Sequence, residues 1–115
     1  MMVAIDYYYQ GVEAFNQGNY NTALKLLLIS DELEPHFKTC HIIFKCYMSI
    51  SKMKEARIFI EKSYKLNPKN DKVAFEYADL LLKLNEKELA IELLKDIIQR
   101  NPSYKSAIKL LNEQT

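Results

Sequence analysis

Apolar residues recur every three or four positions along most of the 115-residue chain. This period is typical of amphipathic helices that bury one face against a core. Six such segments follow one another, and a shorter segment with the same spacing comes last. The predicted helices span residues 4–17, 20–34, 37–50, 53–67, 71–84 and 86–100, with a final helix over 103–112. The pattern therefore predicts an all-α protein.

An internal repeat underlies these helices. The three prolines of the chain lie 33 and 34 residues apart, and each follows an alanine by twelve residues. The marker pairs are Ala23 with Pro35, Ala56 with Pro68, and Ala90 with Pro102. Two residue types that keep the same spacing indicate three copies of one structural unit.

The residues between helices agree with this division. Within the first unit, Gly18 suits a helix end because glycine readily adopts a positive φ. Its counterparts are Ser51-Lys52 and Asn85-Glu86. Each proline follows a second helix, where proline is tolerated. The segment from Pro35 to Cys40 is one residue shorter than the segment from Pro68 to Ala74, so the first turn between units should be the tighter one.

The repeat resembles the tetratricopeptide repeat family. That family has the 34-residue pattern W-x2-L-G-x2-Y, then A-x3-F, then P. The matching residues are Tyr7, Gln10, Gly11, Ala14, Ala23, Leu27 and Pro35 in the first unit; Cys40, Ile43, Phe44, Tyr47, Ala56, Ile60 and Pro68 in the second; and Ala74, Tyr77, Ala78, Leu81, Ala90, Leu94 and Pro102 in the third. Small residues in this pattern let paired helices approach closely.

The resemblance implies a right-handed superhelical solenoid of three antiparallel helix pairs. The repeats would cover residues 4–36, 37–70 and 71–103, within a single domain of residues 1–115. The final helix, over 103–112, would cap the last repeat, with Ser103 as its N-cap. Three units are about the minimum for a stable stack.

The resemblance also implies a function, because the first helices of such repeats line a concave groove that holds a peptide or partner segment. We expect a ligand with apolar anchors and at least one acidic residue. The expected groove residues are Tyr8, Val12, Phe15 and Asn16; Lys38, His41, Lys45 and Met48; and Lys72, Phe75, Asp79 and Leu82. Each of these residues has an alternative role, either packing between units or lying on a solvated face.

One subtype of the family clamps the carboxylate tails of chaperones with lysine, asparagine and arginine side chains. The matching positions here are Tyr8, Val12, Ile42, Lys72 and Glu76. Only Lys72 has a fitting side chain, and Glu76 would repel a carboxylate. The sequence therefore argues against that subtype.

The second helix of the first unit offers another candidate surface. It is apolar on nearly every face, and such a helix is normally buried. Leu24 and Leu27 should pack inside, whereas Leu28 and Ile29 align with charged residues of the later units and should point outward. Local burial and self-association through Leu28 and Ile29 are both open, and a homo-oligomeric structural module is the alternative function.

Composition excludes several other functions. The formal net charge is +1, so the basic excess typical of nucleic-acid binders is absent. His36 and Cys40 are four residues apart, but a zinc site needs three or four ligands, and no catalytic or phosphate-binding motif is present. We therefore expect no enzyme activity, no metal and no cofactor. The absence of a leader or long apolar run and two free thiols, Cys40 and Cys46, favour a cytoplasmic protein.

Overall fold

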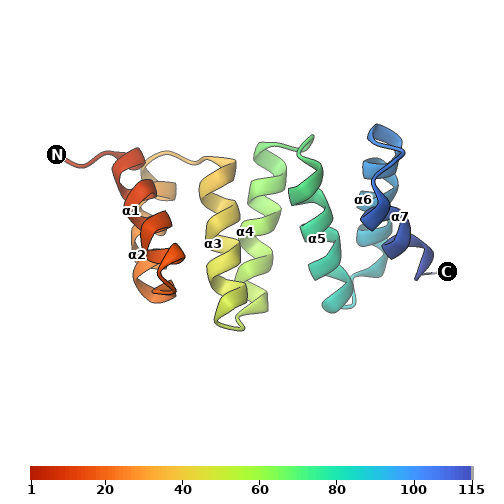
Figure 1. Ribbon diagram of the computed structural model, residues 1–115, viewed down its shortest axis with the longest axis horizontal. Helices are drawn as coiled ribbons and strands as arrows, with labels where there is room; N and C mark the ends of the chain where they lie inside the picture. Colours follow the sequence, from red (N-terminus) through yellow and green to blue (C-terminus); the bar gives the residue numbers. More distant parts are fainter. Residues whose placement is uncertain (115) are drawn as a thin grey trace. The chain divides into compact units, whose positions relative to one another are not determined.

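The computed structural model describes residues 1–114, which form seven α-helices and no strand (Figure 1). The helices are α1 (Ala4–Asn16), α2 (Tyr20–Leu33), α3 (Phe37–Ser49), α4 (Met53–Leu66), α5 (Asp71–Lys83), α6 (Lys87–Arg100) and α7 (Lys105–Asn112). The all-α prediction is confirmed. Both ends of each of the first six helices lie within one residue of their expected positions.

The contacts divide the chain into two compact units, and each is described by itself. The first comprises Met1–Asn67 and holds the pairs α1–α2 and α3–α4; the second begins at Pro68 and holds α5–α6 with α7. Within each pair the helices pack side by side (Figure 1). The expectation that both units form a single domain remains a prediction.

Small residues bring paired helices into close contact. Ala23, Ala56, Ala78 and Ala90 are fully buried. At Gly11 a β-carbon would lie only 2.6 Å from Cγ and 2.7 Å from Cδ2 of Leu27 on α2. These separations are shorter than a carbon–carbon contact permits, so α1 reaches its position against α2 only because residue 11 is glycine.

The turn inside each pair uses the same backbone geometry. Gly18, Ser51 and Asn85 adopt φ values of 80°, 61° and 63°. In the second pair the amide of Lys52 donates to the carbonyl of Tyr47 at 2.8 Å, and the amide of Ser51 donates to Met48. This is the Schellman arrangement that ends a helix at a left-handed residue. The expectation for Gly18 is confirmed, and a serine and an asparagine serve the same purpose in the other pairs.

In each helix pair, a side-chain hydrogen bond or ion pair links the end of the second helix to the start of the first helix. Ser30 Oγ donates to the carbonyl oxygen of Ala4 at 2.8 Å, and Ser63 Oγ donates to that of Phe37 at the same distance. The equivalent residue in the third pair is Ile97, which cannot donate. There, Arg100 binds the Asp71 carboxylate through two nitrogens at 2.9 and 3.0 Å.

The connections between pairs follow the predicted lengths. Three residues, 34–36, separate α2 from α3, whereas four residues, 67–70, separate α4 from α5. Each connection ends in a side-chain cap: His36 Nδ1 accepts from the Lys38 amide at 3.1 Å, and Asn70 Oδ1 accepts from the Val73 amide at 3.1 Å. A tighter first turn is confirmed.

Helix α7 packs on α6 as a terminal helix. Ala107 is fully buried, while Lys105 and Lys109 are exposed. The expected N-cap was wrong: α7 begins at Lys105, and its N-cap residue is Tyr104. Ser103 instead donates its hydroxyl to the side chain of Asn101 at 3.1 Å, so it stabilises the preceding turn.

The core of the first unit contains a buried polar cluster. Asp31, on α2, accepts from Cys40 Sγ of α3 at 3.3 Å and from Lys62 Nζ of α4 at 2.5 Å. Burial, together with the hydrogen bond to Asp31, raises the pKa of the Cys40 thiol to about 12. Burial also raises the pKa of Cys46 to about 11. Both thiols are free and fully buried.

Candidate peptide-binding surfaces

The first unit presents the expected residues of α1 at two depths. Tyr8 and Phe15 are half-buried and pack against the core cluster around Ala14 and Leu27. The rings of Phe15 and Tyr20 also meet edge to face at 5.7 Å. Val12 is half-buried and Asn16 is exposed. The aromatic residues therefore help to hold the helix pair together and offer a ligand only their outer edges.

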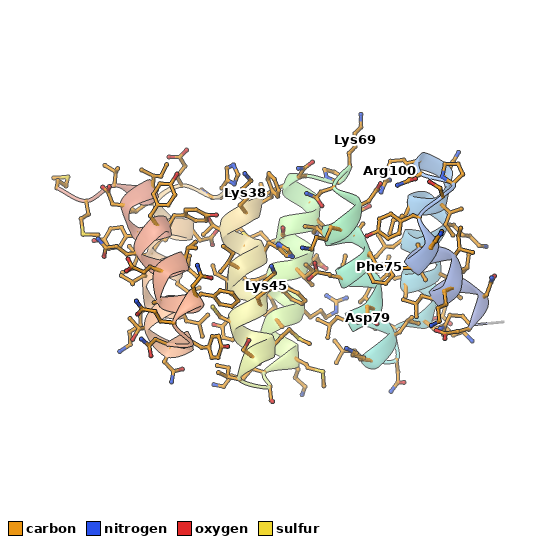
Figure 2. The ribbon with its side chains drawn as sticks, in the orientation of Figure 1. Lys38, Lys45, Lys69, Phe75, Asp79 and Arg100 are labelled. Atoms are coloured by element: carbon orange, nitrogen blue, oxygen red, sulfur yellow. The ribbon has the colours of Figure 1, made fainter. Side chains whose placement is uncertain are left out.

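Helix α3 adds a row of basic side chains. Lys38 lies near the start of α3 and Lys45 lies further along it (Figure 2). Neither lysine has an ion-pair partner among residues 1–114. His41 stacks on Phe44 with ring centroids 6.0 Å apart, and Met48 is half-buried. Two unpaired cations thus accompany one stacked imidazole on this helix.

A cavity of about 430 Å³ opens where the start of α1, the end of α2 and the start of α3 meet. Two expected residues, Tyr8 and Lys38, line it. The other lining residues are Ala4, Ile5, Tyr9, Ser30, Glu34, His36 and Thr39. The rings of Tyr8 and Tyr9 form an edge-to-face pair, 5.4 Å between centroids, along its wall.

Sequence reasoning missed Ile5 and Tyr9. They are 55% and 63% exposed, which is high for such large apolar side chains. Their spacing of four residues, with Val12 three further on, is the helical signal that identifies them as neighbours on one face.

The second unit places its expected residues on α5. Phe75 is half-buried and packs against Tyr104, with ring centroids 5.9 Å apart. Asp79 pairs with Lys83 one turn later at 3.2 Å. Lys72 is exposed and has no ion-pair partner in the described residues, and Leu82 is half-buried. Figure 2 labels Phe75 and Asp79 on this helix.

Leu28 and Ile29, two neighbouring residues of α2, differ in how far they are exposed. Ile29 is 40% exposed, as expected. Leu28 does not point outward: it is half-buried and packs against the core of the first unit. Leu33, one turn after Ile29, is 56% exposed, so Ile29 and Leu33 form the outward apolar face of α2.

His36 and Cys40 do not face a common ligand. Nδ1 of His36 is committed to the start of α3, and the Cys40 thiol donates to Asp31. Within residues 1–114, no group of three or more histidine, cysteine or acidic side chains is arranged to hold a metal ion. Nor does any helix in that range combine the length and apolarity needed to cross a bilayer.

Three helix pairs with close small-residue contacts, left-handed turns and a terminal helix define a helical repeat protein of the kind that binds polypeptides. Residues 51–113 match the tetratricopeptide repeat family. Because this match covers more than half of the chain, the protein belongs to that family. No curated protein matches the sequence significantly.

Solved structures share the fold. The first tetratricopeptide domain of Spaghetti (RPAP3), solved with the HSP90 peptide SRMEEVD, has a TM-score of 0.82 at 18% identity over 96% of this chain and 88% of that one. MamA has a TM-score of 0.85 at 21% identity, over 94% of this chain and 60% of MamA. Yeast Tom70 has a TM-score of 0.84 at 21% identity, and the match covers 96% of this chain but only 23% of Tom70.

Proposed function

We propose that this protein is a scaffold or adaptor that binds a segment of another protein through the outward faces of its first helices, α1, α3 and α5. Membership of the tetratricopeptide repeat family supports a protein-interaction role. The observation that carries the proposal is the set of lysines on these helices. Lys38, Lys45 and Lys72 lie beside half-exposed aromatic and aliphatic side chains and have no ion-pair partner among residues 1–114.

The chemistry of these faces favours a ligand with apolar anchors and acidic residues. A ligand would bury the apolar edges of Tyr8, Val12 and Leu82 when it binds. The lysines attract carboxylates that lie within about one Debye length. Tyr8, Phe15 and Phe75 also pack within their own units, so they contribute shape more than free surface.

The ligand differs from the chaperone tails bound by the neighbouring structures. RPAP3 domains were solved with HSP90 and HSP70 peptides that both end in EEVD. In this chain Tyr8, Val12 and Ile42 replace the polar side chains of the carboxylate clamp, and Glu76 brings a negative charge. A terminal carboxylate bound here would lose much of its hydration, and these side chains would not replace the lost hydrogen bonds. We therefore propose an internal segment as the ligand.

The proposed role has no catalytic step and needs no cofactor. The buried thiols fit a reducing compartment, so we place the binding function in the cytoplasm. The net charge of +1 favours a protein ligand over nucleic acid.

Exchanging Lys45 and Lys72 for glutamate should abolish capture of the partner from a lysate of the source cell. Both side chains lie on first helices and have no ion-pair partner in the described chain, so their loss should affect the ligand and not the fold. The matched control is Lys54→Glu with Lys95→Glu, two exposed lysines of the second helices. Quantitative mass spectrometry of the captured proteins measures the effect, and unchanged thermal unfolding verifies the fold.

The groove proposal is contradicted if the Lys45→Glu, Lys72→Glu protein retains every partner that the control retains. Phe75→Ala is less suitable for this test, because Phe75 packs against Tyr104 and its removal would also loosen α7.

A second candidate function is homotypic assembly through α2. The observation that favours it is the outward pair Ile29 and Leu33, which are 40% and 56% exposed and lie one helical turn apart. Exposed apolar faces of this kind commonly bind another protein surface. Leu28 no longer belongs to this face, because it packs inside the first unit.

Light scattering over a range of protein concentrations tests this candidate. Association through α2 would give a molar mass that rises with concentration, and Ile29→Glu with Leu33→Glu would return it to that of the monomer. Ile58→Glu, at a 61% exposed position of α4, is the control and should not change the mass. A monomeric wild-type protein at every concentration would exclude homotypic assembly.

A further inference from the structure

The cavity of the first unit has apolar side chains in its wall and opposite charges among its lining residues. Ile5 and the tyrosine pair Tyr8–Tyr9 form its wall. Glu34 contributes a carboxylate, whereas Lys38 contributes an ammonium group. These opposite charges leave the cavity close to neutral. It therefore suits an uncharged, apolar side chain better than a charged one.

The charge along α3 changes beyond the cavity. Lys45 lies seven residues after Lys38 on the same helix, and Figure 2 shows the two along its length. Neither lysine forms an ion pair within the described residues. This part of the helix therefore complements an acidic group.

We infer that the first unit binds an extended peptide whose apolar side chain enters the cavity beside Ile5 and Tyr9 while an acidic residue contacts Lys45. The inference rests on the proposed peptide-binding function and specifies its ligand. Seven residues of helix advance about 10 Å, and an extended peptide advances about 3.3 Å per residue. Ile5 and Tyr9 lie on the neighbouring helix α1, and packed helices are about 8–10 Å apart. The apolar and acidic residues of the ligand are therefore about three to four positions apart.

The geometry also explains why both groups are needed. A single apolar side chain in an open cavity stabilises a complex weakly, and an exposed ion pair adds about 1 kcal/mol or less. Held at a fixed spacing by one extended backbone, the two contacts act together, because the second forms without a further loss of translational freedom.

Selection of random 12-residue peptides displayed on phage against the immobilised full chain tests the inference. The selected peptides should share an aliphatic or aromatic residue three to four positions from an aspartate or glutamate. A fluorescein-labelled selected peptide should then bind about fivefold or more weakly to Ile5→Ser and about tenfold more weakly to Lys45→Glu. Lys54→Glu, on the exposed face of α4, should bind like the wild-type protein.

Selected peptides without this spacing, or with basic residues in place of acidic ones, would overturn the inference and leave the proposed function intact. Equal binding by Ile5→Ser and the wild-type protein would do the same, because it would place the apolar contact elsewhere. A failure to enrich any peptide would also overturn the inference, and the lysate capture experiment with the Lys45→Glu, Lys72→Glu protein would then decide the proposed function independently.

Discussion

Replacing Leu27 by alanine is expected to lower the free energy of unfolding by about 2–5 kcal/mol, the range observed for buried leucines. Leu27 is fully buried between α1 and α2. Its removal leaves a cavity that neighbouring side chains fill only in part. Urea denaturation followed by circular dichroism measures the change. The matched control is Leu33→Ala on the same helix, which should cost far less because Leu33 is 56% exposed.

The contact between Gly11 and Leu27 gives a second prediction for the same pair of helices. Alanine at position 11 would bring its methyl group to 2.6 Å from Cγ of Leu27. Because Cγ is the branch point of a buried side chain, relief requires a shift of the whole residue. Overpacking of this kind costs about 1–3 kcal/mol, which exceeds the gain of about 1 kcal/mol from replacing glycine in a helix. Gly11→Ala alone should therefore be destabilising.

The double variant should behave differently from the sum of its parts. In Leu27→Ala protein the methyl group introduced at position 11 enters space that the leucine has vacated. Gly11→Ala should then be neutral or stabilising, and the coupling energy of the cycle should be about 1 kcal/mol or more. Additive effects would show that the approach of α1 to α2 does not depend on this contact.

Removing the Asp31 carboxylate should lower the free energy of unfolding by about 2–3 kcal/mol. Asp31→Ala leaves the buried Cys40 thiol without its acceptor and Lys62 without its counter-ion. Loss of one partner from a buried pair costs about 3–5 kcal/mol, and a smaller effect is expected here because the Lys62 side chain is 39% exposed. Thermal and urea unfolding of the variant measure the loss.

Two comparisons make this result specific. Breaking the more exposed pair between Lys83 and Asp79 by Lys83→Ala should cost about 0.5 kcal/mol, the usual value for such helix pairs. Replacing both partners, by Asp31→Leu with Lys62→Met, should recover most of the stability, because a well-packed apolar pair removes the cost of burying charge. Equal losses for Asp31→Ala and Lys83→Ala would show that burial does not strengthen the Asp31–Lys62 pair.

The stability of the buried cluster around Asp31 should also depend on pH, because the cluster contains the Cys40 thiol. The pKa of the Cys40 thiol is raised to about 12 from an ordinary value near 9.0. The unfolded chain therefore loses this proton at lower pH than the folded protein does. The contribution of the Cys40 thiol to stability is fully present below its pKa in the unfolded chain, and it falls as the pH rises from that pKa towards the pKa in the folded protein. Near neutral pH the thiol is protonated in both states, so the stability does not vary with pH through this group.

The candidate site divides into parts that the sequence reveals and parts that it does not. Positions on a helix face follow from the helical period: Lys38 and Lys72 are exposed on first helices, and Lys45 is half-buried. Whether an aromatic side chain is free depends on its neighbours. Phe75 packs against Tyr104 of the turn before α7, and no pattern within α5 indicates that contact.

The sequence alone determined the repeat, the helices and the class of protein. The alanine and proline markers are visible directly in the sequence, and the positive φ at Gly18 and the shorter connection before α3 depend on residues close in the chain. Local backbone preference and helical period encode these features directly. Their threefold recurrence makes the signal strong, although each copy departs from the family pattern.

Only the tertiary structure decided what each partly apolar or polar side chain does. It packed Leu28 against the core of the first unit and left Ile29 exposed, and it joined Asp31 to Lys62 across 31 positions. It also moved the start of α7 beyond Ser103 and opened the cavity beside Ile5. The physical reason is that burial and pairing depend on atoms supplied by a neighbouring helix. The period of a helix gives the direction of a side chain, and the helix packed against it decides what that side chain contacts.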